Sequence, residues 1–98
     1  MPASSIHERR ARLRALVASG RTVAVPGATD ALSARLIERH GFEAVYIGSY
    51  ATAASRYGLP DTGLLTLDDL ASQARTIVNA VSLPVIADAE GGDRKSVV

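Results

Sequence analysis

Two carboxylates, Asp88 and Glu90, follow an apolar run at residues 84–87 and precede two glycines. Residues two apart on an extended strand point the same way, so these side chains are placed to act together. Carboxylate oxygens suit a hard divalent cation such as Mg²⁺ or Mn²⁺, and Asp61 can supply a third carboxylate. The spacing alone leaves an alternative open, in which Asp88 caps a turn and Glu90 is solvated.

A second candidate is the small-residue segment 48–51, which follows another apolar run. Its backbone N–H groups and the Ser49 hydroxyl can bind a carboxylate or a phosphate. A tight connecting turn is the alternative interpretation of the same residues. The sequence contains neither the P-loop lysine motif nor the glycine fingerprint of dinucleotide-binding folds.

The hydrophobic pattern predicts elements in the order α, then β-α-β-α-β, and these elements would position both candidates. Helices are expected at residues 4–19, from 29 or 30 to 40, and from a Thr66 cap to about 81; strands at 22–25, 44–47 and 84–87; and a long loop at 48–65. The strands are continuous apolar runs, which is typical of parallel strands covered on both faces. Ligands bind at the C-terminal ends of such strands, where the two candidate segments would meet.

Several polar residues of the predicted helices receive structural interpretations. Ser5 with Glu8 has the spacing of a capping box, and Asp30 is expected to cap the second helix. The basic residues of the first helix are expected to form a solvated face; they are Arg9, Arg10, Arg12 and Arg14.

The two histidines lie in helical regions, away from the predicted strand ends. Neither His7 nor His40 has a partner at a metal-ligand or catalytic-triad spacing, so we expect both on the surface. Arg56 and Tyr57 lie in the long loop, where contact with an acid substrate and contact with a neighbouring subunit are both open.

Composition narrows the classes of function. The chain has 98 residues, a net charge of +1 and no cysteine. Near-neutral charge argues against a dedicated nucleic-acid-binding protein, and thiolate metal sites and disulfides are excluded. No apolar run approaches the length of a membrane span, and the N-terminal region has charges where a signal peptide needs an apolar core. We therefore expect a cytoplasmic protein with no nucleic-acid or membrane partner.

Four segments match one known family in order and spacing over nearly all of residues 5–92. They are residues 25–28 with 30–34, residues 41–46, residues 53–55 with 58–66, and residues 83–92. On these motifs the chain resembles the isocitrate lyase/phosphoenolpyruvate mutase superfamily, particularly members akin to methylisocitrate lyase and oxaloacetate decarboxylase.

The resemblance implies a (β/α)₈ TIM barrel, of which this α/β chain would be the N-terminal part with about three β/α units. It implies a Mg²⁺-dependent (or Mn²⁺-dependent) lyase or mutase that acts on C–C or P–C bonds of small carboxylic or 2-oxo acids through an enolate-type intermediate. Homo-oligomers, as tetramers, are implied for the full-length protein.

The resemblance also assigns roles to individual residues. Asp88 would bind the metal directly, Glu90 stands at a second metal position, and Asp61 would complete the shell through water and contact the substrate. Ser49, Tyr50 and Ala51 would hold the substrate's carboxylate. A metal together with backbone donors is a chemically sensible way to stabilise an enolate oxygen.

The sequence departs from the family pattern at several points. Thr29 stands where an aromatic residue is usual, and the lid and later strands of the family are not found, so no general acid or base can be named.

Residues 93–98 match one reading frame of a common sequencing adapter, and we expect them to be a non-native tail after a lyase portion at 1–92. The alternatives are an inactive fragment or non-catalytic assembly piece, and a small α/β anion-binding domain.

Overall fold

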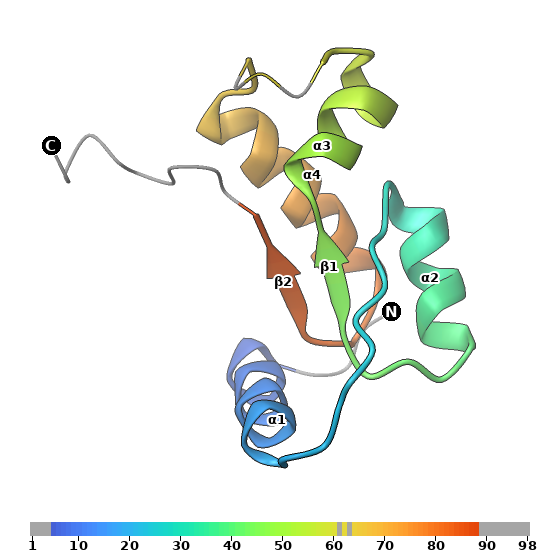
Figure 1. Cartoon of the computed structure of the whole chain (residues 1–98), viewed down its shortest axis with the longest axis vertical. Helices are drawn as coiled ribbons and strands as arrows, with labels where there is room; N and C mark the ends of the chain where they lie inside the picture. The colour runs from blue at the N-terminus through green and yellow to red at the C-terminus, as the bar shows by residue number, and fades with distance from the viewer. Residues whose placement is uncertain (1–4, 61, 63, 89–98) are drawn as a thin grey trace, which may run out of the picture.

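The computed structural model describes residues 5–60, 62 and 64–88. The elements are α1 (Ile6–Ala18), α2 (Ala31–Arg39), β1 (Val45–Ile47), the single turn α3 (Ser49–Ala51), the π-helical turn η1 (Thr52–Arg56), α4 (Leu67–Ala80) and β2 (Val85–Ala87). β1 and β2 pair in parallel with Val45 opposite Val85. Figure 1 shows the two strands side by side, with α1 at the end where they begin. The predicted α/β class with parallel strands is confirmed.

Each of the longer helices begins at a side-chain cap that the sequence predicts. Ser5 and Glu8 form a reciprocal capping box at α1, and Thr66 caps α4 in the same way with Asp69. Asp30 caps α2 by accepting a hydrogen bond from the Ser33 backbone N–H at 2.7 Å. These contacts satisfy N–H groups that have no partner inside the helix, and they confirm the predicted helix starts.

The first predicted strand, residues 22–25, is wrong. This segment pairs with β1 only further along, at a bridge between Gly27 and Tyr46. The Tyr46 N–H donates to Pro26 O, and the Ala28 N–H donates to Tyr46 O, each at 2.9 Å. The next donor back along the ladder would be the nitrogen of Pro26, which carries no hydrogen. The ladder therefore stops at a single bridge.

The second correction concerns the predicted loop 48–65, which contains α3 and η1. Small residues fill this stretch, and the Thr52 hydroxyl donates to the Gly48 carbonyl at 2.9 Å. At its end Gly58 has a φ of 65°, a left-handed conformation that glycine adopts without strain. The long loop is therefore helical directly after β1.

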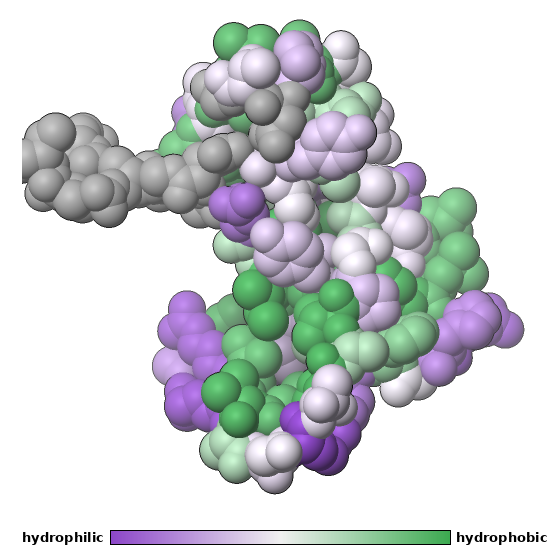
Figure 2. All heavy atoms as spheres, viewed as in Figure 1, coloured by the Kyte–Doolittle hydropathy of each residue, from purple (hydrophilic) through white to green (hydrophobic). Residues whose placement is uncertain are grey.

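The hydrophobic core lies between the sheet and the helices α2 and α4. Its members include Val45 and Ile47 of β1, Ile77 of α4 and Ala34 of α2, all buried. The opposite face of the sheet is open: Tyr46 is 37% exposed and Ile86 is 36% exposed. Apolar side chains gather on this open face above α1 (Figure 2).

The expectation that both faces of the strands are covered is therefore wrong for the described residues. Helices pack on only one face of this sheet. In a closed barrel the helices cover the outer face of the strands, and the inner face packs against the side chains of the remaining strands.

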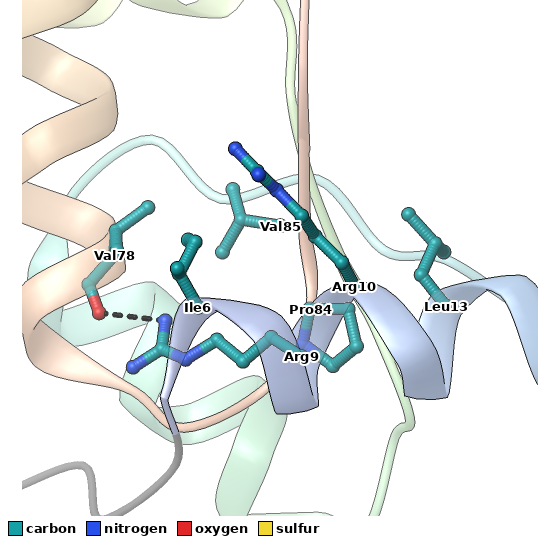
Figure 3. Close-up of a pocket in the computed structure, with 7 residues that line it drawn as sticks. All are labelled: Ile6, Arg9, Arg10, Leu13, Val78, Pro84 and Val85. Atoms are coloured by element: carbon teal, nitrogen blue, oxygen red, sulfur yellow. Dashed lines mark hydrogen bonds between the residues drawn. The ribbon is translucent and has the colours of Figure 1, made fainter.

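The first helix closes the end of the sheet where the strands begin, and Arg9 makes the contact. Arg9 is 6% exposed, and its guanidinium donates to Val78 O at 3.0 Å and to Val81 O at 2.6 Å. Arg12 bonds to Ser82 O. Figure 3 shows Arg9 reaching from α1 to the end of α4. Arg9 also lines a pocket of about 170 Å³.

The predicted solvated face of four arginines is therefore wrong for Arg9, and Arg12 also has a protein partner. The carbonyls at a helix C-terminus lack intrahelical donors, and a guanidinium supplies several donors at once. Burial lowers the pKa of Arg9, and the nearby charge of Arg12 lowers it further. We call the contacts of Arg9 and Arg12 with residues 78–83 the arginine clasp.

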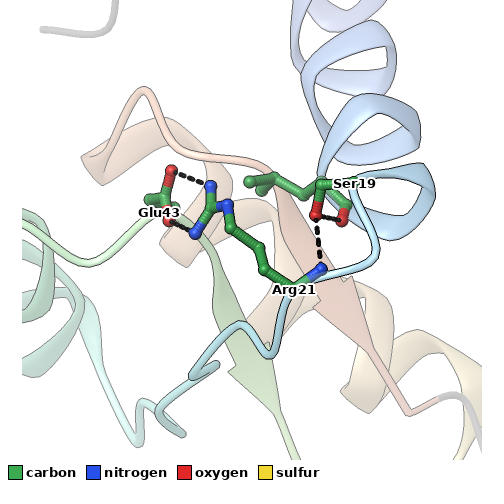
Figure 4. Close-up of polar contacts among 4 residues, drawn as sticks. Ser19, Arg21 and Glu43 are labelled. Atoms are coloured by element: carbon green, nitrogen blue, oxygen red, sulfur yellow. Dashed lines mark hydrogen bonds and ion pairs between the residues drawn. The ribbon is translucent and has the colours of Figure 1, made fainter.

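Two acidic side chains reinforce the same end of the sheet. Glu38 accepts hydrogen bonds from the Ser82 backbone N–H and hydroxyl. Glu43, in the turn before β1, makes a two-pronged ion pair with Arg21, with both N–O distances at 3.0 Å (Figure 4). Both partners of this ion pair are about half exposed. The turn into each strand is thus tied to a neighbouring segment.

Candidate active site

The C-terminal ends of β1 and β2 bring Ser49 and Asp88 together. Both residues follow their strands closely, and the register pairs Ile47 with Ala87. The ladder continues one step further, since the Asp88 N–H donates to Ile47 O at 2.8 Å. The Ser49 hydroxyl then donates to Asp88 Oδ2 at 3.1 Å. Two residues 39 positions apart in sequence thus meet at the edge where ligands of parallel α/β folds bind.

Burial distinguishes the two side chains. Ser49 is 7% exposed, whereas Asp88 is half-buried. A half-buried carboxylate keeps an open side toward solvent and can accept a ligand there. A buried hydroxyl with few rotamers available holds one carboxylate oxygen and so orients the other.

The other two predicted carboxylate-binding residues, Tyr50 and Ala51, differ in their exposure to solvent. Ala51 is half-buried, but the Tyr50 side chain is 66% exposed. Gly48 lies beneath the Tyr46 ring, because a Cβ added there would come within 3.3 Å of Tyr46 Cε2. Glycine at this position lets the chain turn closely under the ring.

Two predicted metal residues, Asp61 and Glu90, lie outside the described residues, as does the predicted tail at 93–98. Within 5–60, 62 and 64–88, no cluster of three or more His, Cys, Asp or Glu residues is present. Asp88 carries carboxylate oxygens, the donor type that Mg²⁺ prefers, and Mg²⁺ commonly uses only one or two protein carboxylates. The described donor is therefore compatible with Mg²⁺, and the complete set of ligands stays a prediction.

Sequence reasoning missed Gln73, which is 2% exposed in the middle of α4. Its Nε2 donates to Thr29 O at 2.7 Å, and its Oε1 accepts from Arg56 Nη1 at 2.7 Å. A signal was available, because Gln73 falls three residues after Leu70 on the apolar side of the predicted helix. A polar residue at a core position usually has hydrogen-bond partners.

The histidines and the helix cap have structural roles. His40 is exposed and its ring nitrogen Nδ1 lies 2.7 Å from Leu36 O, and His7 is exposed on α1. Asp30 is occupied by its helix cap. In the part of the chain that the structure describes, no helix combines the length and hydrophobicity of a membrane span.

Comparison with known proteins decides the family. The model of the phosphoenolpyruvate phosphomutase family matches residues 13–98. This chain belongs to that family. The 2,3-dimethylmalate lyase of Eubacterium barkeri is 46% identical over 82 residues, which make up 84% of this chain and 28% of the relative. Relatives in this family are named as lyases and mutases, so the family is enzymatic.

Solved structures agree with this assignment. A crystal structure of 2,3-dimethylmalate lyase, described as a member of the PEP mutase/isocitrate lyase superfamily, aligns with a TM-score of 0.70 at 43% identity, covering 82% of this chain and 29% of the other. A complex of phosphonopyruvate hydrolase with oxalate and Mg²⁺ aligns with a TM-score of 0.73 at 34% identity, covering 82% and 28%.

The superfamily that the sequence motifs indicate is thus confirmed. The structural relatives are TIM-barrel superfamily members, and the chain has the fold of part of such a barrel. It spans less than a third of the length of the relatives to which it is compared.

Proposed function

We propose that this chain carries the metal-binding and carboxylate-binding edge of a Mg²⁺-dependent lyase or mutase. The complete enzyme would act on C–C or P–C bonds of small carboxylic acids through an enolate-type intermediate, as a cytoplasmic homo-oligomer. The observation that carries the proposal is the hydrogen bond between Ser49 Oγ and Asp88 Oδ2 at the C-terminal ends of β1 and β2.

In this proposal Asp88 would hold the cation, with Glu90 beside it and Asp61 joined through water. The cation, when bound, supplies positive charge next to the substrate's oxygen atoms. Ser49 orients the Asp88 carboxylate through the 3.1 Å hydrogen bond. Backbone N–H groups of Ser49–Ala51 would bind the substrate's carboxylate. A carboxylate, a hydroxyl and backbone donors at one edge suit an anionic substrate bound alongside a divalent cation.

Cation binding by the full chain tests the metal half of this proposal. Mn²⁺, which reports its binding by electron paramagnetic resonance, is titrated into the unaltered chain, Asp88→Ala and the control Asp68→Ala. Asp68 is an exposed carboxylate in the first turn of α4. Loss of a direct ligand should weaken Mn²⁺ binding about 100-fold or more, beyond the usual cost of losing a residue that supports a ligand. Equal affinities for all three proteins would refute the metal site.

Oxalate, a small dicarboxylate, separates the alternative functions in the same samples. Oxalate binding that requires Mn²⁺ supports the proposal. Equal oxalate binding without a metal ion would instead support the small anion-binding domain. Absence of both Mn²⁺ and oxalate binding would support the non-catalytic piece.

Turnover is tested in a chimera, because the chain spans 28% of the length of the E. barkeri lyase. Residues 5–88 of this chain replace the aligned segment of that enzyme, and cleavage of 2,3-dimethylmalate is measured. We expect measurable cleavage that is lost in the Asp88→Ala chimera. A folded chimera that keeps its full activity after this substitution would overturn the role of Asp88.

A further inference from the structure

A buried amide on α4 connects two segments of the chain, the backbone at Thr29 and the end of η1, which follows the candidate site residues Ser49–Ala51. Gln73 donates from Nε2 to the Thr29 carbonyl and accepts at Oε1 from Arg56, both at 2.7 Å. An amide has two donors on one side and an acceptor on the other, so these partners determine its orientation. We call this set of contacts, from Thr29 through Gln73 to Arg56, the glutamine bridge.

The Arg56 end of the bridge is held by further contacts. Its Nη2 donates to Ser72 Oγ at 3.2 Å, and its guanidinium carbon lies 5.5 Å from the centre of the Tyr57 ring. Such a position over an aromatic face is favourable for a cation. The guanidinium of this exposed residue is thus fastened to α4.

Arg56 is also the last residue of η1, which follows directly after Ser49–Ala51. π-Helical turns are rare and often occur at functional sites. Fastening the end of η1 to α4 restricts how the turn can rewind, and therefore restricts where Ser49–Ala51 lies. The opposite end of the bridge holds the backbone at Thr29, which follows the segment bridged to β1.

The glutamine bridge is separate from the contacts that stabilise α4 itself. α4 begins at the Thr66 cap, and its last turn is held by Arg9. Gln73 lies between these anchors and uses its side chain entirely on segments that lead to the candidate site. This arrangement is expected of a residue that positions neighbouring loops.

We propose that Gln73 and Arg56 are positioning residues, which set the backbone of Ser49–Ala51 to receive the substrate's carboxylate and hold the backbone at Thr29 in place. This inference rests on the proposed function. The contacts of Gln73 are with Thr29 and Arg56, so we expect the bridge to affect binding of the carboxylate and to leave binding of the cation unchanged.

The test measures oxalate affinity of the full chain by calorimetry at saturating Mn²⁺, and Mn²⁺ affinity separately. Arg56→Gln removes the charged end of the bridge at an exposed position, and Gln73→Leu removes both bonds with little change in volume. Arg75→Gln is the matched control, because Arg75 is an exposed arginine of α4. We expect oxalate to bind about fivefold more weakly in the two bridge variants, the equivalent of one typical hydrogen bond. Mn²⁺ affinity should stay within about twofold of the unaltered chain, and the control should match the unaltered chain in both measurements.

A conservative variant distinguishes positioning from general damage. Arg56→Lys retains the charge and an N–H donor group but not the planar fork, so it should recover part of the oxalate affinity. Unchanged oxalate affinity in Arg56→Gln, or equal losses of oxalate and Mn²⁺ affinity, would overturn the positioning role while leaving the proposed function intact. An unaltered chain that binds no oxalate in the presence of Mn²⁺ would overturn both.

Discussion

The two ends of the β1–β2 sheet use polar side chains in opposite ways. At the end where the strands begin, Arg9 is buried and its donors are directed at backbone carbonyls of residues 78 and 81. At the end where the strands finish, Ser49 is buried, whereas Asp88, which accepts its hydrogen bond, is only half-buried. A buried charge that bonds the chain's own carbonyls stabilises the fold, whereas a carboxylate that is partly exposed can also be reached by a ligand. In barrels of this kind, stability and chemistry are divided between the same two ends.

The largest effect on stability is expected from breaking the arginine clasp. Arg9→Met retains much of the aliphatic stem but leaves buried carbonyls without donors, so the free energy of unfolding should fall by about 3 kcal/mol. Urea denaturation measures this change. Arg10→Met is the control, because Arg10 is exposed on the same helix. A loss no larger than that of the control would show that the clasp contributes nothing to stability.

At the C-terminal ends of the strands we expect a substitution to affect Mn²⁺ affinity more than stability. Ser49→Ala removes the hydroxyl that orients Asp88, so Mn²⁺ affinity should fall about tenfold, as for other residues that support a metal ligand. The free energy of unfolding should fall by only about 1 kcal/mol, the value of one hydrogen bond. Ser55→Ala, at an exposed serine of η1, is the control. A variant with unchanged Mn²⁺ affinity and a stability loss as large as that of Arg9→Met would remove the distinction between the two ends.

A smaller effect, dependent on pH, is expected at the end where the strands begin. Burial raises the pKa of Glu38, but the Ser82 hydrogen bonds and the charge of Arg9 outweigh it, so the pKa lies below its ordinary value of 4.5. The folded chain therefore binds fewer protons than the unfolded chain between these two pKa values. The stabilisation is present above pH 4.5 and is lost as the pH falls through the folded value.

Thermal unfolding of the unaltered chain and Glu38→Gln, measured from pH 7 to pH 3, checks this sign. The variant lacks the titrating carboxylate, so the stability difference between the two proteins should shrink as the solution becomes acidic. A difference that stays constant over this range would contradict the role assigned to Glu38.

Local features of this chain could be predicted because they depend on neighbouring residues. The three capping boxes of α1, α2 and α4 involve residues three apart, so their spacing is visible in the sequence. The meeting of the strand ends could also be predicted, because parallel strands with helical crossovers place their C-terminal ends together. The sequence therefore predicts that Ser49 and Asp88 lie at the same edge of the sheet.

Features that depend on distant partners escaped prediction. Arg9 was assigned to solvent because its burial depends on carbonyls about 70 residues away. The strand predicted at 22–25 does not form, because the next hydrogen bond of the ladder would need an N–H at Pro26, and proline has none. Gln73 was overlooked because a polar residue on a helix has no visible partner until Thr29 and Arg56 are placed.

The sequence by itself determined the family, the starts of the three longer helices, the places of β1 and β2, and the identity of the acidic residue that follows β2. These follow from residue types at short and regular spacings. Only the tertiary structure decided which arginine is buried, how far the first strand pairs, and that a glutamine links two segments of the candidate site. The physical reason is that a buried polar group is stable only when specific partners meet it, and those partners are set by the packing of segments far apart in the chain.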